Sequence, residues 1–146
     1  MVTLSETTFQ LSDCPQMMQL EVIHRFLTQS YWAKGIAIET VRQSMQGSLC
    51  IGGFIGGKQI AFARIISDFT TFAYLADVFV LEQYRGHGYS KQLLAHIKLH
   101  PKLQRLRRFM LCTYDAHGLY QQFGFKVLSE TDKMMEIRQP NPYVSV

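Results

Sequence analysis

Hydrophobic side chains in the first third of the chain recur every three or four residues, the spacing of a helix that buries one face. Ser12–Pro15 supplies capping side chains and a proline, so it predicts the start of this first helix. Gly35 interrupts the pattern, and a second short helix is expected over Glu39–Met45. A short strand over Thr8–Leu11 precedes both helices. One face of this expected helix carries Met17, Leu20, Ile23 or His24, and Leu27.

The middle of the chain is rich in β-branched and aromatic residues, and turn residues break it into segments. Ser48–Ile55 and Gln59–Ile66 are predicted to be strands joined by a tight hairpin at Gly56-Gly57. Ser67-Asp68 marks another turn, and Thr70–Leu81 is the expected central strand. This strand stops at a polar turn that contains two glycines.

Beyond the central strand, the pattern predicts one strand–helix–strand unit and a final hairpin. Tyr89, Leu93 and Ile97 share one helical face, and Pro101 ends that helix. The strands are therefore expected to run antiparallel first and then to form one parallel pair through a crossover. This is an α+β fold with a mixed, mostly antiparallel central sheet flanked by helices. The remaining elements are a strand over Arg108–Thr113, a helix over Ala116–Phe123, and a hairpin of Lys126–Leu128 with Met134–Arg138 that closes the sheet.

The turn after the central strand reads Arg85-Gly86-His87-Gly88 and leads directly into a helix. Backbone N–H groups at a helix N-terminus form an anion site, and glycines let a pyrophosphate approach them closely. Arg85 adds a fixed positive charge. The dinucleotide-binding fingerprint requires a third glycine where Lys91 stands, and the P-loop ending is absent from the sequence. The turn thus predicts a phosphate-bearing cofactor outside those two classes.

Composition narrows the class of protein. The 146 residues fit a single domain, 1–146, with a sizeable core. The net charge of +4 suits an anionic cofactor, but the basic residues form no long run that would indicate nucleic-acid binding. Cys14, Cys50 and Cys112 lack the spacing of a disulfide framework or a zinc site, so no metal is expected. Without a signal-peptide pattern over Met1–Glu6 or a membrane-spanning apolar stretch, the expected compartment is the cytoplasm.

Two motifs together resemble the GNAT superfamily of acetyl-CoA-dependent N-acetyltransferases. Arg85–Ser90 is similar to the family's Gln/Arg-x-x-Gly-x-Gly/Ala loop, with Ser90 in place of the last small residue. Ala116–Phe125 contains Leu-Tyr-x-x-x-Gly-Phe, which looks like a second element of the family. Tyr31–Ile36 and Thr113–Tyr120 resemble one bacterial branch of stand-alone acetyltransferases. The resemblance covers nearly the whole chain and implies the same mixed sheet.

The resemblance also implies how acetyl-CoA binds. The backbone of Val78, Phe79 and Val80 is expected to pair with the pantetheine amides, and an N–H near Val80 to polarise the thioester carbonyl. Thr113 stands where many family members have an asparagine that contacts CoA, and Tyr120 is the expected general acid for the leaving thiolate. The pyrophosphate loop comprises Arg85, Gly86, His87, Gly88, Tyr89, Ser90 and Lys91.

Fewer residues in the sequence indicate the general base and the acceptor pocket. Asp77 lies in the central strand beside the expected thioester position, and it is either the base or a structural acid satisfied by the backbone or an arginine. A water chain, which some members of the family use, is a further route for the proton. Tyr31 and Trp32 follow the first helix, and they can either hold an amine by cation–π contact or pack in the core. A loose basic cluster follows in the sequence. Its side chains either face solvent or contact the 3′-phosphate of CoA or an acidic partner. The cluster consists of Lys98, Lys102, Arg105, Arg107 and Arg108.

The resemblance implies an N-acetyltransferase in which a primary amine attacks acetyl-CoA directly within a ternary complex. The acceptor is a small-molecule or a protein amine, and neither nucleic acid nor membrane is expected as a partner. A homodimer is common in the family. The alternative is a non-catalytic module of the same fold that keeps CoA as a ligand or recognises a protein partner.

Overall fold

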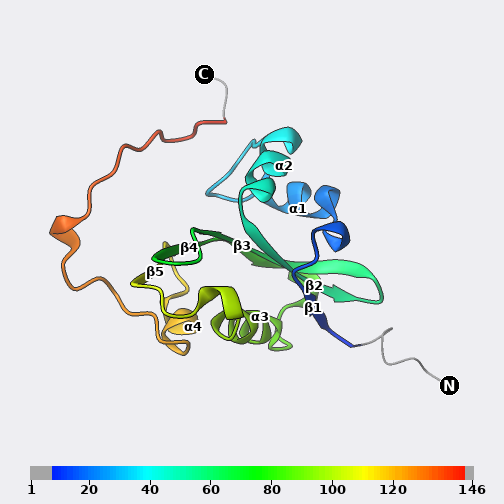
Figure 1. Ribbon diagram of the computed structural model, residues 1–146. Coiled ribbons are helices and arrows are strands. Elements are labelled where there is room, and N and C mark those ends of the chain that lie inside the picture. The colour runs from blue at the N-terminus through cyan, green and yellow to red at the C-terminus, as the bar shows by residue number, and fades with distance from the viewer. Residues whose placement is uncertain (1–7, 144–146) are drawn as a thin grey trace.

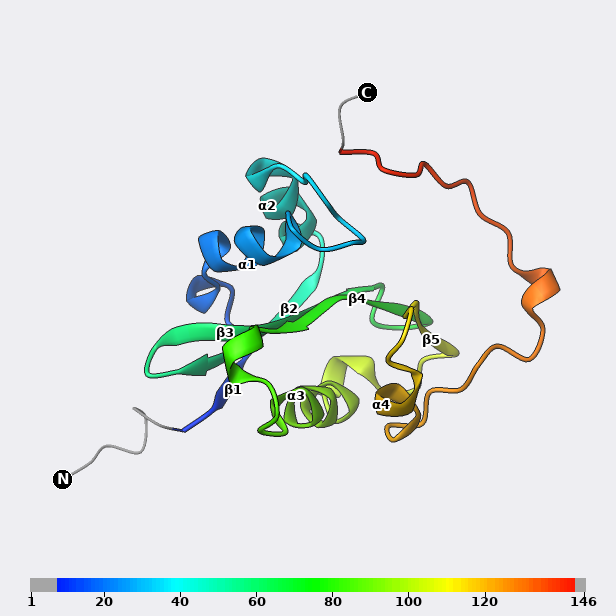
Figure 2. The same cartoon turned by 180° about the vertical axis from the view of Figure 1, so that it is seen from behind.

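Helices cover both faces of a five-stranded sheet, which gives the molecule three layers (Figure 1). The computed structural model describes residues 8–143. Figure 2 shows the same layers from behind, with α1 and α2 above the sheet and α3 and α4 below it. The expected α+β class, with its mostly antiparallel sheet and one crossover, is confirmed.

The strands follow one another across the sheet in chain order. The three pairs of neighbouring strands from β1 to β4 are antiparallel, and β4 pairs with β5 in parallel through the α3 crossover. The β2–β3 hairpin turns at Gly56-Gly57, where both glycines adopt positive φ angles of 56° and 77°. The strands are β1 (Gln10–Ser12), β2 (Leu49–Ile55), β3 (Lys58–Ser67), β4 (Phe72–Val80) and β5 (Arg108–Leu111).

The helices pack on the sheet through two separate apolar cores. On one face α1 (Leu20–Leu27) and α2 (Ile38–Gln46) bury Ile23, Leu27 and Val41 against Phe62 and Phe79. On the other face α3 (Tyr89–Lys98) buries a second core, and the short helix α4 (His117–Gln121) packs beside it. Side chains alternate along each strand, so the neighbours Cys50 and Ile51 belong to opposite cores. The second core includes Ile51, Ile65, Leu75, Leu93, Leu94 and Ile97.

Two predicted element starts differ from the structure. The first helix begins at Leu20, because Pro15–Met17 forms a separate 3-10 turn. The first strand begins at Gln10, since its register is set by pairing of Gln10 with Phe54 in β2. Within residues 8–143, no helix combines the length and the apolar character needed to cross a bilayer.

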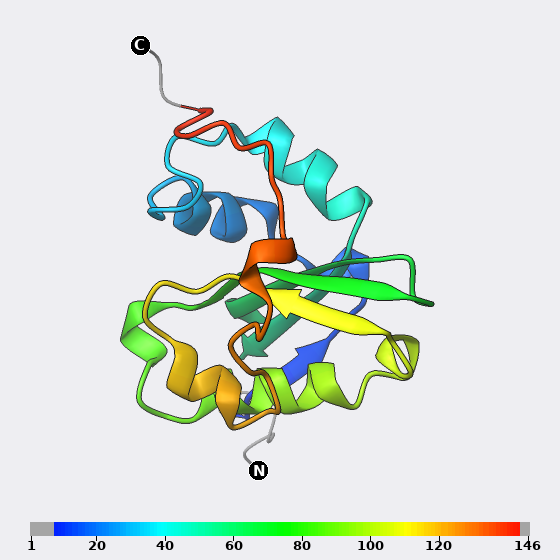
Figure 3. The same ribbon diagram turned by 90° about the vertical axis from the view of Figure 1, so that its left-hand side faces the viewer.

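The predicted final hairpin is wrong. Lys126–Leu128 and Met134–Arg138 form no strands, and β5 is the edge of the sheet among the described residues. Residues 126–143, which we call the C-terminal arm, instead run outward in an extended path with a single 3-10 turn at Thr131–Lys133. Figure 3 shows the arm leaving α4, passing the end of β5 and rising to the helical layer of α1 and α2.

Candidate active site

The site begins where β4 and β5 part. Their pairing covers only Phe72–Leu75 of β4 against β5, and the rest of β4 has no partner on that side within the described residues. The register between β3 and β4 shifts so that Asp77 and Val78 together stand opposite Ala63, as in a β-bulge. A bulge bends its strand, which accounts for β4 diverging from β5 at this point.

The backbone of Val80 points into the gap. The N–H of Leu81 donates to the carbonyl of Ile60 in β3 at 2.8 Å, so residue 81 faces the sheet. Because N–H and C=O directions alternate along a strand, both groups of Val80 face away from β3. The Arg85 Nε donor reaches the Val80 carbonyl at 3.0 Å, in agreement with this direction. The Val80 N–H is thus available to a group bound beside β4.

The predicted anion loop, Arg85–Ser90, follows β4 after a short 3-10 turn at Glu82–Tyr84. Gly86 and Gly88 have φ angles of 86° and 78°, and a Cβ at either would meet no atom within 4 Å. Positive φ is therefore what requires glycine here, and the loop stays open on its outer side. Gly88 caps α3, whose first internal bond runs from the Gln92 N–H to the Gly88 carbonyl at 3.1 Å. The preceding amides at the start of α3 have no acceptor inside the helix, as an anion site needs.

A cavity of ≈ 280 Å³ joins these features. Phe26 of α1 stacks on Phe79 with ring centroids 4.1 Å apart and forms one wall together with Trp32. Tyr120 of α4 forms part of the opposite wall. The sequence did not identify Phe26 as part of the site. The only sign of its role is that it adjoins Leu27, which lies on the expected face of the first helix. The remaining lining residues are Val78, Val80, Tyr84, Arg85, Gly86, Gly88, Tyr89, Ser90, Ala116 and Leu119.

Tyr120 meets the cavity from a half-buried position on α4. Burial is the main cause that raises the pKa of its phenol above the ordinary value of 10, and the nearby Tyr31 phenol adds to this effect. The ring of Phe125 packs edge-on at 6.0 Å between centroids, which holds the orientation of the Tyr120 ring. The Tyr120 phenol therefore stays protonated at neutral pH and can donate its hydrogen to a neighbouring group.

Asp77 is held by two donors. Its φ of 55° at the bulge turns the carboxylate towards the layer of α1 and α2. The Trp32 Nε1 donates to Asp77 Oδ1 at 2.8 Å, and Arg64 Nε donates to Oδ2 at 2.8 Å. Arg64 also donates to the Ser48 hydroxyl at 3.1 Å. The predicted base is therefore an ion-paired carboxylate that does not itself line the cavity, and its role as base stays a prediction.

Tyr31 does not line the first cavity, but its ring packs against Trp32, which does. Its side chain is exposed, and its ring meets Trp32 and Tyr114 edge-on at centroid distances of 5.1 and 6.2 Å. Three aromatic rings thus gather where the acceptor was expected, with Asp77 behind Trp32. Sequence reasoning had no signal for Tyr114, which reaches this group from the loop between β5 and α4.

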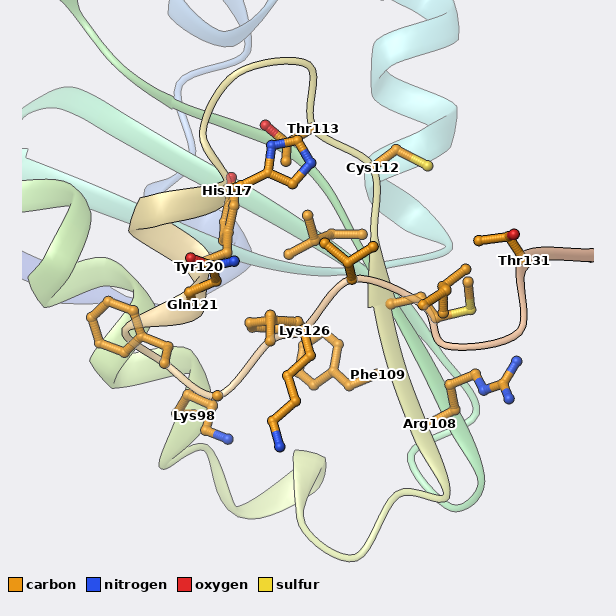
Figure 4. A pocket seen from close by; sticks show the side chains of 17 residues that line it. Lys98, Arg108, Phe109, Cys112, Thr113, His117, Tyr120, Gln121, Lys126 and Thr131 are labelled. Carbon is orange, nitrogen blue, oxygen red and sulfur yellow. The ribbon is translucent and has the colours of Figure 1, made fainter.

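The side chain of Thr113 does not line the first cavity. Its hydroxyl accepts the N–H of Ala116 at 3.0 Å, and this bond caps the turn before α4. Its side chain faces a second cavity of ≈ 450 Å³, between β5, α4 and the first part of the C-terminal arm (Figure 4). His87 and Lys91 belong to the loop and the start of α3 but do not line the first cavity. The structure thus brings together eight of the eleven residues predicted to bind the cofactor.

The residues of the basic cluster do not converge on the first cavity. Lys98 and Arg108 instead border the second cavity, as Figure 4 shows. Among residues 8–143, no group of three or more histidine, cysteine or acidic side chains has the geometry of a metal site.

Comparisons with known proteins identify the family. The model of the acetyltransferase (GNAT) domain matches residues 46–127. A crystal structure of a GNAT-family protein from Xanthomonas campestris pv. campestris has 47% sequence identity and a TM-score of 0.93, covering 94% of this chain and 98% of that one. A Gibberella zeae protein that carries the name of an acetyltransferase is 27% identical over 86% of this chain and 84% of its own length.

A more distant solved structure shares the fold. The Clostridium acetobutylicum protein, described with acetyl-CoA, has a TM-score of 0.63 at 14% identity, covering 90% of this chain and 95% of that one. The domain model alone matches more than half of the chain and spans the parted strands, the glycine loop and Tyr120. The chain belongs to the GNAT family of acetyltransferases, and it is an acyltransferase.

Proposed function

We propose that this protein transfers the acetyl group of acetyl-CoA to a primary amine by direct attack within a ternary complex. The observation that carries the proposal is the first cavity, which places the open backbone of Val80, the Arg85–Ser90 loop and Tyr120 around one space. Those are the three kinds of group that a CoA thioester needs: an amide for the carbonyl, an anion site for the pyrophosphate and a proton donor for the sulfur.

The donor is expected to lie along β4. The pantetheine amides would pair with the open side of Val78 and Val80, as an added strand pairs with a sheet edge. The pyrophosphate would meet the free amides between Gly86 and Lys91, with Arg85 already fixed to the Val80 carbonyl. The related fold of the Clostridium protein, described with acetyl-CoA, supports this choice of donor.

The chemistry then follows from the groups around the thioester. The neutral amine forms a bond to the thioester carbon, and the developing oxyanion accepts the N–H of Val80. As the tetrahedral intermediate collapses, the carbon–sulfur bond breaks and the Tyr120 phenol gives its proton to the leaving thiolate. The amine nitrogen releases its own proton to solvent, and a proton from solvent restores the phenol. The products are the acetylated amine and CoA.

The acceptor is expected to enter on the side of Trp32. The rings of Tyr31, Trp32 and Tyr114 can surround an ammonium group, which cation–π attraction favours over a neutral solute. Both oxygens of Asp77 already accept hydrogen bonds, so we assign this carboxylate to positioning Trp32, with water as the proton acceptor. The amine itself is a small molecule or a protein amine.

The test is release of free thiol from acetyl-CoA in the presence of an amine panel. The panel contains a polyamine, an aminoglycoside, free amino acids, a peptide N-terminus and a peptide lysine. Thiol release above the hydrolysis rate, together with an acetylated product seen by mass spectrometry, is the expected result. Binding of acetyl-CoA without transfer to any amine, at any pH from neutral to alkaline, would contradict transfer to amines while leaving the donor site in place.

A further inference from the structure

The second cavity, of ≈ 450 Å³, has apolar walls, and of its lining only Tyr120 takes part in the proposed reaction. The walls come from β5, from α4 with the residues after it, and from the start of the C-terminal arm (Figure 4). Val127 and Leu128 are 69% and 39% exposed, so the chain itself leaves part of this apolar surface uncovered. A cavity of this size with apolar walls is the usual form of a small-molecule site. Its apolar lining includes Phe109, Leu111, Phe123, Phe125, Val127 and Leu128.

The charged side chains that border this cavity are all basic. Lys98, Arg108 and Lys126 are exposed at its rim, and no aspartate or glutamate is among its lining residues. Within residues 8–143, none of these three side chains forms an ion pair with a carboxylate. The sequence has no acidic residue between Glu82 and Asp115, so neither α3 nor β5 supplies a carboxylate that would neutralise them. The rim therefore favours an anion.

Two of the cations lie at the same edge of the cavity. Gly124 turns the chain at a φ of 93° beside the end of α3, where a Cβ would lie 3.6 Å from Lys98 Nζ. Lys126 follows two residues later, and Figure 4 shows its ammonium group at the same edge as that of Lys98. An ammonium group is a compact charge with three donors, so the pair accepts a carboxylate or a phosphate alike. The cavity thus combines a cationic mouth with an apolar interior.

We propose that the second cavity binds a single-chain amphiphile with an anionic head, such as a medium-chain fatty acid. The head lies between Lys98 and Lys126, and the chain covers the aromatic and aliphatic walls. A cationic amphiphile is disfavoured by like charge at the mouth, and a small polar anion would leave the apolar walls uncovered. Tyr120 lines both cavities, so this site and the proposed acetyl-CoA site share a wall but are separate spaces.

Isothermal titration calorimetry on the full chain tests the class of ligand. The anionic probes are decanoate and decyl phosphate, the controls are decanol and decyltrimethylammonium, and all are kept below the concentration at which micelles form. We expect at least one anion to bind about tenfold more tightly than decanol, as hydrogen bonds to charged groups provide, and the cation not to bind. The stronger of the two anions identifies the head group. Octanoate, two methylenes shorter, should bind about tenfold more weakly than decanoate. Equal affinity for decanol and both anions, or no binding of either anion, would overturn the inference.

Charge variants place the head group. Lys98→Gln/Lys126→Gln should weaken the binding of the preferred anion about tenfold and leave that of decanol unchanged. Lys58→Gln/Lys102→Gln is the matched control, because it removes the same charge from exposed side chains outside the cavity, and it should keep the wild-type affinity. An equal loss of affinity in both double variants would mean that only the net charge matters, which would contradict a head group held at this mouth.

Variants of the wall place the chain. Leu128→Glu puts a carboxylate into the apolar lining at a partly exposed position that the fold tolerates, and it should abolish binding. Ile137→Glu is the control on the same arm, since Ile137 is fully exposed and outside the lining. Gly88→Asp, in the glycine loop, should keep the wild-type affinity for the probe. Binding that survives in Leu128→Glu, or is lost in Gly88→Asp, would assign the probe to another site. Binding to vesicles of an anionic phospholipid, without affinity for the monomeric probes, would replace the ligand site by a membrane contact.

Discussion

The indole N–H of Trp32 donates to Oδ1 of Asp77 at 2.8 Å and so joins two residues 45 positions apart in the sequence. The bond ties the loop after α1 to the bulge of β4, at the point where β4 parts from β5. It fixes one ring of the proposed acceptor side against the strand that is expected to hold the donor. The second carboxylate oxygen is taken by Arg64, so this contact is part of a small polar network.

Asp77→Asn should therefore weaken acceptor binding more than the chemical step. Asparagine can still accept the Trp32 N–H, but Arg64 loses its counter-charge in a site where its side chain is only 16% exposed. Loss of one partner from such a pair costs about 3 kcal/mol of folding stability. We expect a rise in the KM for the amine with kcat within about tenfold, measured at a temperature well below unfolding.

Two further results complete this test. Trp32→Phe removes the N–H while keeping an aromatic ring, and it should raise the amine KM in the same direction. The pH dependence of kcat decides the alternative role of Asp77. If Asp77→Asn lowers kcat by more than a hundredfold and abolishes the acid limb of its pH profile, the carboxylate is the general base after all.

Tyr120→Phe should lower turnover by about 10²–10⁴-fold, the usual contribution of a general acid. Acetyl-CoA affinity should change little, because the ring and its packing against Phe125 are kept. Since burial raises the pKa of this phenol above 10, it stays protonated at neutral pH and loses its proton only beyond its ordinary range. The wild-type rate should therefore show no decline due to Tyr120 below about pH 10. Unchanged turnover of the variant across the pH range would remove Tyr120 from the mechanism.

Thr113→Ala separates a structural from a cofactor role. The hydroxyl caps the turn before α4 through the Ala116 N–H, so its loss should reduce the free energy of unfolding by about 1 kcal/mol. The dissociation constant for acetyl-CoA should stay within about threefold, which is under 1 kcal/mol. A large loss of acetyl-CoA affinity in a well-folded Thr113→Ala variant would show instead that this residue contacts the cofactor, as the family pattern suggested.

The cysteines should differ in reactivity. Burial raises the pKa of the Cys50 thiol to about 11, so below that pH the folded protein holds it protonated. Because the thiolate is the reactive form, Cys50 should resist alkylation at pH 8 while the exposed Cys112 reacts. Peptide mapping after a short iodoacetamide pulse measures this. Labelling of Cys50 as fast as Cys112 in folded protein would contradict its burial in the α1–α2 core.

Local signals explain why most of the fold was predictable. Gly56-Gly57 between two β-rich runs fixed the β2–β3 hairpin, and the strand–glycine–helix sequence at Arg85–Ser90 fixed the start of the crossover. That most of the first cavity's lining lies together was predictable for the same reason, since those residues come from one continuous stretch and one nearby motif.

The rest depends on contacts between distant segments. Nothing near Asp77 in the sequence reveals that Arg64 and Trp32 hold it, because a bulge turns the carboxylate to the other layer. The alternating pattern of Met134–Arg138 predicts a strand, but the structure forms none there, because alternation alone does not supply a sheet edge for the segment to pair with.

The most direct test of the account is thermal unfolding with and without acetyl-CoA, in Gly88→Asp and in a matched control. Gly57→Asp is that control, because Gly57 shares the positive φ and the open surroundings of Gly88 but lies in the β2–β3 turn. At a hundredfold excess over its dissociation constant, acetyl-CoA should add about 2.7 kcal/mol to the stability of the wild type and of Gly57→Asp. Gly88→Asp should gain nothing, since a carboxylate would face the phosphates. An equal gain in all three proteins, or none in the wild type, would contradict the assignment of the glycine loop as the site of acetyl-CoA.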